Sequence, residues 1–472
     1  MKTYTTQNNK KILRQAAVIA FWIGLWQLLA IAVDNSLLLP TVGETLYALL
    51  NLLDEGEFYA NIGWTFFRCV LSMVISFVTG MTAAWLAYRK DFLRSFFTLP
   101  VGFFKAVPVM AIVIYVILLV ESDWVAVIVC FLMCFPIVYT NVLSGLDAMD
   151  SKLLEVAYIY RLSVTQKIKY FYLPCIMPQI KAAVRLIAGL SWKAVVAAEV
   201  LSIPKYSLGY EMIIAKNYLQ TSTLFSYIIV IVALSLVMEK LIDIILKRWN
   251  YKGYEGSRVL KSVTKTQRKA ARKSHGEDVA VTDLSKRFGE NTVFCDLSMN
   301  FEKDRVTCIV GPSGQGKTTL LRIIAGLEDA DVGRITGNES SVSYLFQEDR
   351  LLPWLNTFDN MALSVINEGN AAKEGVKRMA EVLEISDALW KLPEELSGGM
   401  RHRAALGRTF LADASLVLLD EPFRGLDIEL KNRIIDRIWK KATNHKTVIM
   451  VTHSQEDAKE LGDRVIELTD VV

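Results

Sequence analysis

Long apolar segments fill the first half of the chain, and only short apolar runs occur in the second half. About 20 apolar residues cross ~30 Å of hydrocarbon as a helix, and six segments reach that length. They lie near 15–33, 62–88, 96–120, 124–145, 179–204 and 224–246. From about residue 278 the apolar runs shorten to four to eight residues between charged stretches, which is typical of a water-soluble α/β domain. The pattern predicts a multi-domain chain: an all-α polytopic membrane domain with about six spans over 1–250, a linker over 251–277 and an α/β domain over 278–472.

Positive charge is unevenly distributed between the loops. Lys152, Arg161, Lys167 and Lys169 lie between the fourth and fifth spans, whereas the 34–61 loop contains no Lys or Arg. Because short cytoplasmic loops are enriched in Lys and Arg, we expect a multi-pass protein of the cytoplasmic membrane with its N-terminus and its α/β domain in the cytoplasm. A basic stretch at 247–273 carries ten Lys or Arg residues against one acid, which indicates a tether at the lipid surface. No small-residue cleavage site follows the first span, so we expect an uncleaved anchor.

Composition narrows the class of protein. The chain has 472 residues, 53 basic and 49 acidic, for a net charge of +4, and 52% of its residues are hydrophobic. This composition excludes a disordered chain and argues against a purely soluble one, and the balanced charge argues against a nucleic-acid partner. Six cysteines without regular spacing do not form a disulfide scaffold. Cys130 and Cys134 are expected to be buried apolar side chains.

A glycine-rich loop follows a short apolar strand at 306–310 and precedes a helical pattern. The loop is Gly311, Pro312, Ser313, Gly314, Gln315, Gly316, Lys317 and Thr318, followed by Thr319. This is the G-x-x-x-x-G-K-[ST] phosphate loop in its strand–loop–helix context. Backbone N–H groups surround the phosphates, Lys317 reaches the β- and γ-phosphates, and Thr318 offers a hydroxyl to Mg²⁺.

Further polar residues follow apolar runs later in the chain. Asp420 ends the run at 416–420 and is suited to hold Mg²⁺ through water, and Glu421 is placed to polarise an attacking water as a general base. His453 lies just beyond the run at 447–451, within reach of a γ-phosphate. The small residues before a predicted helix could contact a phosphate through their backbone; the segment is Leu396, Ser397, Gly398, Gly399 and Met400.

In this order the motifs resemble the ATP-binding cassette of the ABC transporter superfamily, over about 278–472. The resemblance implies ATP and Mg²⁺ as cofactors, with the metal near Thr318, Gln347 and Asp420. It also implies that Gln347 is the Q-loop glutamine, that Asp427 is the D-loop aspartate, and that 396–400 is the signature that closes over ATP bound to another cassette. Phe288 matches the aromatic that stacks on adenine, although a core position fits it equally well.

Two departures accompany this resemblance. The signature ends in Met400 where glutamine is commoner, and the D-loop reads Arg424-Gly-Leu-Asp427 where small-Ala-Leu-Asp is usual. The stretch 346–354 is similar to cassettes of nitrate, sulfonate and taurine importers. Each ATP site in this family takes its signature from a second cassette. One cassette per chain therefore implies a second copy of the chain, and a twofold homodimer is the simplest assembly that completes both sites.

The segment 152–174 resembles the EAA loop of binding-protein-dependent importers, whose short cytoplasmic helix docks on the cassette. Glu155, Ala157 and Pro174 carry the match, whereas Arg161 stands where the family usually has glycine. An ordinary amphipathic interfacial helix is the alternative for this segment. Across about 60–245 the membrane half also resembles the nitrate, sulfonate and taurine group, and the architecture implied is that of a type I ABC importer.

Charged residues inside the predicted spans are costly and usually face a cavity or a partner. Lys193 and Glu199 lie ~240° apart around the fifth span, so a direct pair is not expected. One could line a solute pathway while the other packs against a neighbouring helix. Arg68 and Lys105 have either a pathway role or a side chain that snorkels to the interface.

Three functions remain open at this stage. The first is an ATP-driven importer that homodimerises in the lipid membrane and receives a small solute, such as an oxyanion, a sulfonate or a vitamin precursor, from an extracytoplasmic solute-binding protein. The second is an ABC exporter, since exporters usually place the cassette after the membrane half. The third is a non-transporting ATPase that couples nucleotide state to membrane signalling.

Overall fold

The structure is a computed structural model that describes residues 2–248, 259, 276–339, 341–366 and 370–468. It separates into two compact units. We call Met1–Ala148 with Ile176–Trp249 the helical unit, and Met149–Cys175 with Asn250–Val472 the α/β unit. The predicted order, a helical membrane domain followed by an α/β domain, is confirmed. Most of the predicted linker lies outside the described residues.

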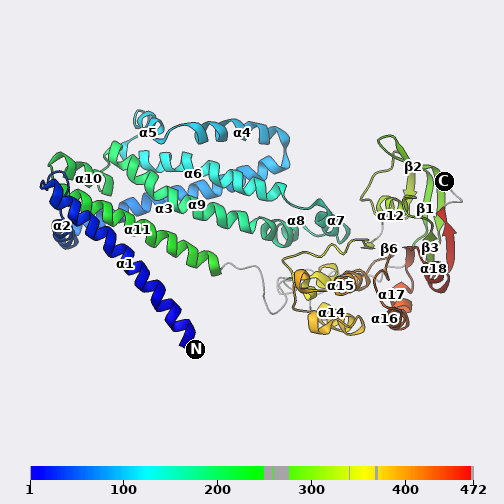
Figure 1. Cartoon of the computed structure of the whole chain (residues 1–472). Coiled ribbons are helices and arrows are strands. Elements are labelled where there is room, and N and C mark those ends of the chain that lie inside the picture. The colour runs from blue at the N-terminus through cyan, green and yellow to red at the C-terminus, as the bar shows by residue number, and fades with distance from the viewer. Residues whose placement is uncertain (1, 249–258, 260–275, 340, 367–369, 469–472) are drawn as a thin grey trace. The chain divides into compact units, whose positions relative to one another are not determined.

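The helical unit contains long helices joined by short connections (Figure 1). Its helices are α1 (Lys2–Val33), α2 (Val42–Asp54), α3 (Gly56–Arg89), α4 (Asp91–Ala106), α5 (Val109–Ile117), α6 (Ser122–Asp147), α9 (Leu173–Ser202), α10 (Leu208–Asn217) and α11 (Thr221–Arg248). Helices α3 and α6 pack closely through small residues. A Cβ atom at Gly80 of α3 would lie 2.8 Å from the Val138 Cβ of α6, so this crossing requires glycine. Cys130 and Cys134 are buried in the same region, as expected.

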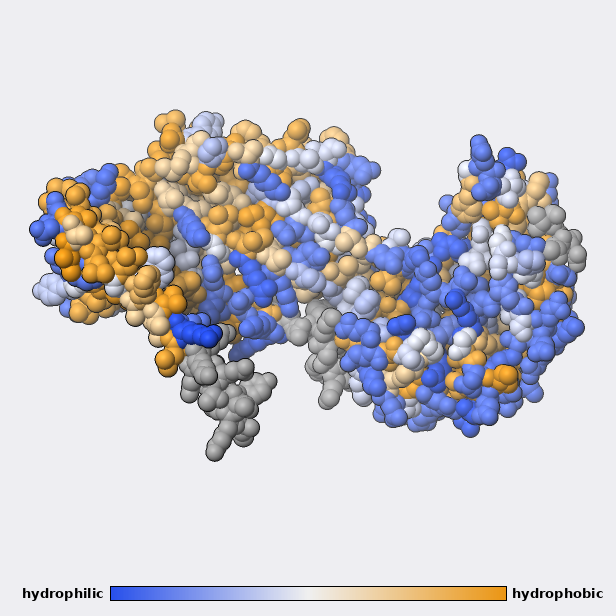
Figure 2. Space-filling model, viewed as in Figure 1, coloured by the Kyte–Doolittle hydropathy of each residue, from blue (hydrophilic) through white to orange (hydrophobic). Residues whose placement is uncertain are grey.

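Several helices of this unit have the length and apolarity of membrane spans. Among the described residues, three helices are each long and apolar enough to cross a membrane: Leu13–Val33, Gly56–Arg89 and Ser122–Asp147. Apolar side chains dominate the visible surface of the helical unit, whereas polar residues cover most of the α/β unit (Figure 2). The predicted spans near 179–204 and 224–246 fall on α9 and α11, which are not among those three helices, and the number of spans stays a prediction.

The predicted single span at 96–120 is wrong. Helices α4 and α5 replace it, bent by 103° at the break between them. The break is at Val107 and Pro108, where Val107 is extended with φ −74° and ψ 131°. A proline disfavours helical backbone in the residue before it, so Pro108 accounts for the break. The two helices make one broken span or a re-entrant segment.

The α/β unit is built on two sheets. An antiparallel sheet has the order β2 (Asn291–Phe301), β1 (Val279–Phe288), β4 (Val332–Thr336), and a parallel sheet has the order β5 (Val342–Leu345), β6 (Leu416–Asp420), β7 (Thr447–Val451), β3 (Val306–Val310), β8 (Arg464–Glu467). Strands β3, β6 and β7 are buried at every residue, as expected for central strands of a parallel sheet covered on both faces. Their carboxyl ends therefore present the following loops at one edge.

Helices cover this sheet and complete the unit. They are α12 (Lys317–Ile324), α13 (Thr357–Ala362), α14 (Asn370–Val382), α15 (Gly398–Leu411), α16 (Ile428–Ile434), α17 (Lys440–Thr443) and α18 (Gln455–Leu461), with a π-helical turn at Ile435–Trp439 and 3₁₀ turns at Leu363–Val365, Ser386–Ala388 and Pro393–Glu395. The segment between α6 and α9 also belongs here. It forms α7 (Ser151–Ile159), α8 (Val164–Lys167) and a π-helical turn at Ile168–Tyr172, and its Ala157 and Phe171 are buried in the core of the α/β unit.

Candidate nucleotide site and coupling segment

The glycine-rich loop joins the carboxyl end of β3 to α12. Gly316 has φ +83°, and a Cβ atom there would lie 2.4 Å from Val293 Cγ1, so only glycine fits this left-handed, crowded position. The Lys317 ammonium donates to the Gly311 and Pro312 carbonyl oxygens at 2.7 and 2.6 Å. Burial lowers the pKa of Lys317. Two carbonyl oxygens of the loop thus hold the lysine ammonium in place.

A cavity of about 280 Å³ opens beside this loop. Its lining comprises Phe288, Val293, Ser313, Gly314, Gly316, Lys317, Thr318, Thr319, Gln347, Asp420, Glu421, Val451 and His453. Most of the residues predicted for one nucleotide site are therefore brought together. Phe288 is half exposed at the cavity, as a ring that stacks on a base would be.

Thr318 and Asp420 form the metal side of this cavity. The Thr318 hydroxyl donates to Asp420 Oδ2 at 2.8 Å, and Gln347 lines the same space. Burial raises the pKa of Asp420, and the hydrogen bond from Thr318 and the Lys317 charge oppose that rise. A hydroxyl, an amide and a carboxylate are oxygen ligands of the kind that Mg²⁺ prefers, so these three residues fit the metal that a nucleotide would bring.

Glu421 has a strained backbone and an available carboxylate oxygen. Its φ is +54°, a left-handed value that costs about 1–2 kcal/mol for a non-glycine residue. Its Oε1 is buried without a hydrogen-bond partner in the described part of the chain and lies 3.4 Å from His453 Nε2. Burial and the neighbouring Asp420 charge raise the pKa of Glu421, and His453 partly opposes this rise. Such a carboxylate is placed to accept a proton from a water molecule.

The signature segment lies apart from this cavity. Ser397 caps α15, its hydroxyl accepting from the Met400 amide at 3.3 Å, while Leu396 is buried and Met400 packs on the core. Asp427 caps α16 by accepting from the Leu430 amide at 2.8 Å. None of 396–400 lines the cavity described above. The signature thus stands at the start of a 14-residue helix, where the helix dipole would stabilise an anion.

Glu155 joins α7 to two arginines of the α/β fold. Its carboxylate accepts from the Arg322 guanidinium at 2.9 and 3.0 Å, and it also pairs with Arg350. Burial raises the pKa of Glu155, but the two arginines outweigh burial and hold it below its ordinary value. Arg322 lies on α12, directly after the phosphate loop, and Arg350 follows Gln347 by three residues. One carboxylate therefore contacts two segments that begin at the nucleotide cavity.

Arg161 adopts the conformation that glycine would adopt freely. Its φ is +47°, and the turn closes through the Leu162 amide, which donates to the Ala157 carbonyl at 3.0 Å. The Arg161 guanidinium donates to the Glu339 carbonyl oxygen at 2.9 Å. The turn therefore forms although arginine stands in place of glycine. The left-handed backbone of this residue costs free energy, which the arginine's contacts partly offset.

Pro174 interrupts the hydrogen-bond ladder at the base of α9. Because proline has no N–H, the carbonyl four residues earlier, Tyr170, loses its usual donor. The Trp354 indole supplies one, donating to the Tyr170 oxygen at 2.7 Å. This hydrogen bond joins the segment 152–174, which we call the coupling segment, to the loop that follows Gln347.

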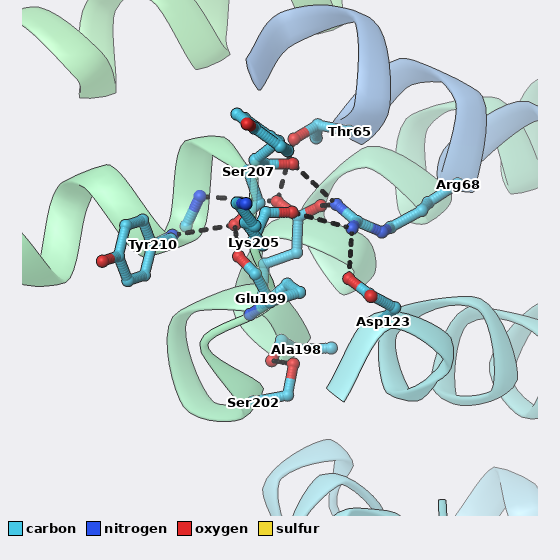
Figure 3. A network of polar contacts seen from close by, with 12 residues as sticks. Thr65, Arg68, Asp123, Ala198, Glu199, Ser202, Lys205, Ser207 and Tyr210 are labelled. Carbon is cyan, nitrogen blue, oxygen red and sulfur yellow. Dashed lines mark hydrogen bonds and ion pairs between the residues drawn. The ribbon is translucent and has the colours of Figure 1, made fainter. Parts of the chain in front are cut away.

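Arg68 is the centre of a polar network in the helical unit (Figure 3). Its guanidinium pairs with Glu199 and with Asp123, each at 3.0 Å, and also donates to the Tyr206 and Lys205 carbonyl oxygens. Its side chain is 5% exposed, so the snorkelling interpretation is wrong for Arg68. The guanidinium is held inside because α6 supplies Asp123, α9 supplies Glu199, and the loop after α9 supplies the Lys205 and Tyr206 carbonyl oxygens.

Glu199 is wholly buried in this network. Besides Arg68, it accepts from the Thr65 hydroxyl at 3.0 Å and the Gly209 amide at 3.4 Å. Lys193, one of the predicted pathway residues, is exposed on α9. Arg68 and Asp123 do line a cavity of about 380 Å³, together with Trp64, Phe67, Trp124, Val127, Lys205 and Tyr206.

Several partners were not predicted from the sequence. They are Arg322, Arg350, Asp123, Trp354 and His402. Each lies more than 50 positions from at least one of its partners, so local spacing gives no signal for the pairing. For Asp123 the sequence did offer a signal. It is an acidic residue beside an apolar segment, and Arg68 inside a predicted span needs an acidic partner.

Comparisons with known proteins match both units. Residues 294–424 match the ABC transporter family, and residues 76–251 match the family described as the binding-protein-dependent transport system inner membrane component. The aliphatic sulfonates import ATP-binding protein of Albidiferax ferrireducens is 39% identical over 206 residues, which are 41% of this chain and 72% of that protein.

Two further similarities have lower sequence identity. The sulfate/thiosulfate import ATP-binding protein of Neisseria meningitidis serogroup A is 35% identical over 208 residues, which are 40% of this chain and 58% of that protein. The chain thus spans little more than half of that relative's length. A solved dimeric ATP-binding cassette, bound to ADP and Pi after hydrolysis, is 21% identical with a TM-score of 0.37 and covers 40% of this chain and 93% of that one.

Proposed function

The chain belongs to the ABC transporter family, with a permease unit and an ATP-binding cassette in one polypeptide, and we propose that it imports a small solute driven by ATP hydrolysis. The observation that carries this proposal is the contact of Glu155 with Arg322 and Arg350. It links a segment of the kind found in importers to both the phosphate-loop helix and the segment after Gln347. The match to the binding-protein-dependent permease family favours import over export.

In this proposal the cavity beside the phosphate loop binds Mg-ATP. Lys317 holds the phosphates, and Thr318, Gln347 and Asp420 hold the metal, which neutralises phosphate charge when bound. Glu421 accepts a proton from the attacking water through Oε1, which has no hydrogen-bond partner in the described part of the chain, and His453 Nε2 orients this carboxylate from 3.4 Å. The raised pKa of Glu421 strengthens its basicity at neutral pH.

We also propose that two copies of the chain work together. The signature segment lies outside the chain's own nucleotide cavity, so a second cassette must supply it. Chains with Lys317→Ala and with Ser397→Arg should each be inactive alone. Mixed dimers of the two variants should recover about half of the wild-type ATPase per dimer, because one composite site contains neither change. Full inactivity of purified mixed dimers would contradict this arrangement.

The membrane half is proposed to lie in the cytoplasmic membrane with the cassette inside, and an extracytoplasmic solute-binding protein is proposed to deliver the solute. The match to a binding-protein-dependent permease family supports this partner. Relatives named for sulfonate and sulfate import make a small oxyanion or sulfonate the first solute class to test.

The test is uptake into proteoliposomes that contain Mg-ATP. Full-length protein is reconstituted with the cassette inside, and labelled aliphatic sulfonate and sulfate are added outside with the candidate binding protein. Accumulation inside that needs ATP and vanishes in Glu421→Gln supports import. Extrusion of preloaded solute would instead support an exporter, and ATPase activity that no solute or binding protein changes would support a signalling role.

A further inference from the structure

A cavity of about 600 Å³ opens at one end of the helical unit. Its walls come from α2, α10, the first turns of α11 and the segment between α1 and α2. Figure 1 shows α2 and α10 together at this end of the unit. Cavities that bind small organic molecules have volumes of about 300–1,000 Å³, so this cavity has the size of a ligand site.

The cavity lies near the carboxyl end of α9. This helix begins at Leu173 and runs for 30 residues to Ser202, which is ~45 Å of helix. Helix α10 follows after a short loop. In the proposed topology the segment before α9 is cytoplasmic, so the carboxyl end of α9 is extracytoplasmic. The cavity is therefore at the end of the unit where an imported solute would arrive.

Three carboxylates line the cavity without a compensating positive charge. They belong to Glu44 of α2, Glu55 between α2 and α3, and Glu211 of α10. No described lysine or arginine lines the cavity with them. The hydrogen bonds that Glu44 and Glu211 accept come from neutral groups, the Thr41 backbone amide at 2.9 Å and the Asn61 side-chain amide at 3.2 Å. The cavity is thus acidic.

Glu211 shows the effect of this concentration of negative charge. Burial, together with the charges of Glu57 and Glu55, raises the pKa of Glu211, and the hydrogen bond from Asn61 partly opposes this rise. Carboxylates that share a site without a cation repel one another. A bound cation would remove this repulsion, so the cavity favours a positively charged ligand.

Tyr227 is a second, independent indication of a ligand. It lies on α11 and lines the cavity, with only 3% of the residue exposed. Its ring contacts Phe58, but no described residue forms a hydrogen bond with its hydroxyl group. The charges of Glu211 and Glu55 act on this hydroxyl. A buried hydroxyl without a partner is unfavourable, and a polar ligand in the cavity would supply a partner.

Contacts between the walls hold the cavity open. The Thr221 hydroxyl donates to the Leu37 carbonyl oxygen at 2.8 Å, and the Ser226 hydroxyl donates to the Thr45 carbonyl oxygen at 2.9 Å. These two bonds join α11 to α2 and to the segment before α2. Because the walls are already ordered, a ligand loses little of its binding free energy to ordering them.

We propose that this cavity binds a small organic solute through an ammonium group of that solute. The ammonium donates charge-assisted hydrogen bonds to Glu211 and Glu55, and the Tyr227 hydroxyl accepts from it at the buried end of the cavity. The proposal rests on the import proposed above and adds a chemical feature of the solute. The relatives are named for the import of sulfonate and sulfate; here the ammonium group is required whether or not the solute also carries an acid group.

A metal ion and a simple anion fit the cavity less well. Among the described residues, no group of three or more His, Cys, Asp or Glu side chains is placed to hold a metal ion. An anion would be favoured by the helix dipole at the first turn of α11, where Thr221, Ser222 and Thr223 line the cavity. It would also face the three carboxylates, so an acid group binds there only in a molecule that brings its own positive charge.

Equilibrium dialysis with full-length protein in lipid nanodiscs, without ATP, tests the proposal. Propylamine, 3-aminopropanesulfonate and propanesulfonate are labelled probes with the same carbon chain, and empty nanodiscs give the background. We expect both amines to bind, and propanesulfonate, which has no ammonium group, to bind about tenfold more weakly or worse. Propanesulfonate binding as tight as that of propylamine, or no binding of either amine, would overturn the proposal.

Two variants locate the bound amine. In Glu211→Gln the dissociation constant of propylamine should rise about tenfold, because a hydrogen bond to a charged group is weakened. Tyr227→Phe should raise it about three- to tenfold and leave the Tm of the ligand-free protein unchanged, since the hydroxyl has no described partner to lose. Glu121→Gln is the control; Glu121 is exposed, precedes α6 and does not line the cavity, so this variant should bind as wild type does.

Tyr227→Phe also decides the case in which Glu211→Gln does not fold. If Tyr227→Phe binds propylamine as tightly as wild type does, the amine is bound elsewhere and the proposal is wrong. The proposal is also wrong if no amine binds while Glu211→Gln weakens the docking of a solute-binding protein, because the cavity would then receive a basic side chain of that protein.

Binding and transport can fail separately. Amine binding that depends on Glu211, without any ATP-driven uptake in proteoliposomes, supports this site and counts only against the proposed import. ATP-driven uptake of propanesulfonate that is unchanged in Glu211→Gln supports import and overturns the ammonium site.

Discussion

The Glu155 carboxylate accepts two hydrogen bonds from the Arg322 guanidinium, at 2.9 and 3.0 Å. Glu155 belongs to the segment between two predicted membrane spans, and Arg322 belongs to the helix that starts at the phosphate loop. Two parallel N–H···O bonds fix orientation as well as distance. In the proposed importer, this contact would pass movement of the phosphate-loop helix to the coupling segment.

Replacing this carboxylate should uncouple the two activities of the protein. In Glu155→Gln, two arginines lose a partly buried anionic partner, so we expect a loss of about 1–3 kcal/mol in the stability of the contact and a large drop in transport per ATP hydrolysed. Lys152→Gln is the matched control, since Lys152 pairs with Glu348 in an exposed position at 2.8 Å and such pairs contribute little. Solute uptake and ATPase, measured together in proteoliposomes, test this prediction; equal coupling ratios in both variants would contradict it.

The same contact should depend on pH in a defined direction. The pKa of Glu155 is lowered in the folded protein from an ordinary value of 4.5. Its stabilising effect is therefore complete above the unfolded-state pKa and is lost as the pH falls through the lower folded-state pKa. Thermal unfolding of wild type and Glu155→Gln should differ by a constant amount from pH 8 to about 5 and converge below about 4.5. A difference that grows on acidification would oppose this account.

Removing the proposed general base should stop turnover without stopping binding. Glu421→Gln keeps the size and polarity of the side chain but cannot take a proton, so kcat should fall by about 10²–10⁴-fold with ATP affinity nearly unchanged. Steady-state ATPase and equilibrium nucleotide binding measure the two effects. Glu429→Gln, whose side chain is 88% exposed, should behave as wild type; more than a tenth of wild-type turnover in Glu421→Gln would exclude Glu421 as the base.

The left-handed turn at Arg161 allows a paired test of strain. Arg161→Ala loses the arginine's hydrogen bond and keeps the strained φ, whereas Arg161→Gly loses the bond and relieves the strain. We expect the glycine variant to be more stable than the alanine variant by about 1 kcal/mol, which corresponds to roughly 2–4 °C in Tm for a domain of this size. Equal melting temperatures would show that the turn relaxes without strain.

Contiguous motifs could be predicted from the sequence, and contacts between distant residues could not. Lys317, Thr318, Asp420 and Glu421 follow strands whose apolar runs are visible in the sequence, so the topology of a parallel sheet collects them at one edge. The pairing of Arg68 with Glu199 joins positions 131 apart, and it depends on how α3 and α9 pack. No periodicity along either helix contains that information.

The bend between α4 and α5 shows an error that the sequence could have prevented. The apolar run at 96–120 has the length of a span, and length alone predicts one helix. Pro108 stands near its middle and restricts Val107 to extended backbone. A prediction that gave this local restriction more weight than hydropathy would have divided the segment correctly.

Native mass spectrometry of the complex, purified gently from its own membranes, tests the central claim most directly. The account predicts two copies of this chain together with an extracytoplasmic protein that carries a small molecule. It also predicts that adding this protein with its solute stimulates ATP hydrolysis. A bare dimer whose ATPase is vigorous and unaffected by any such protein would contradict import and favour export.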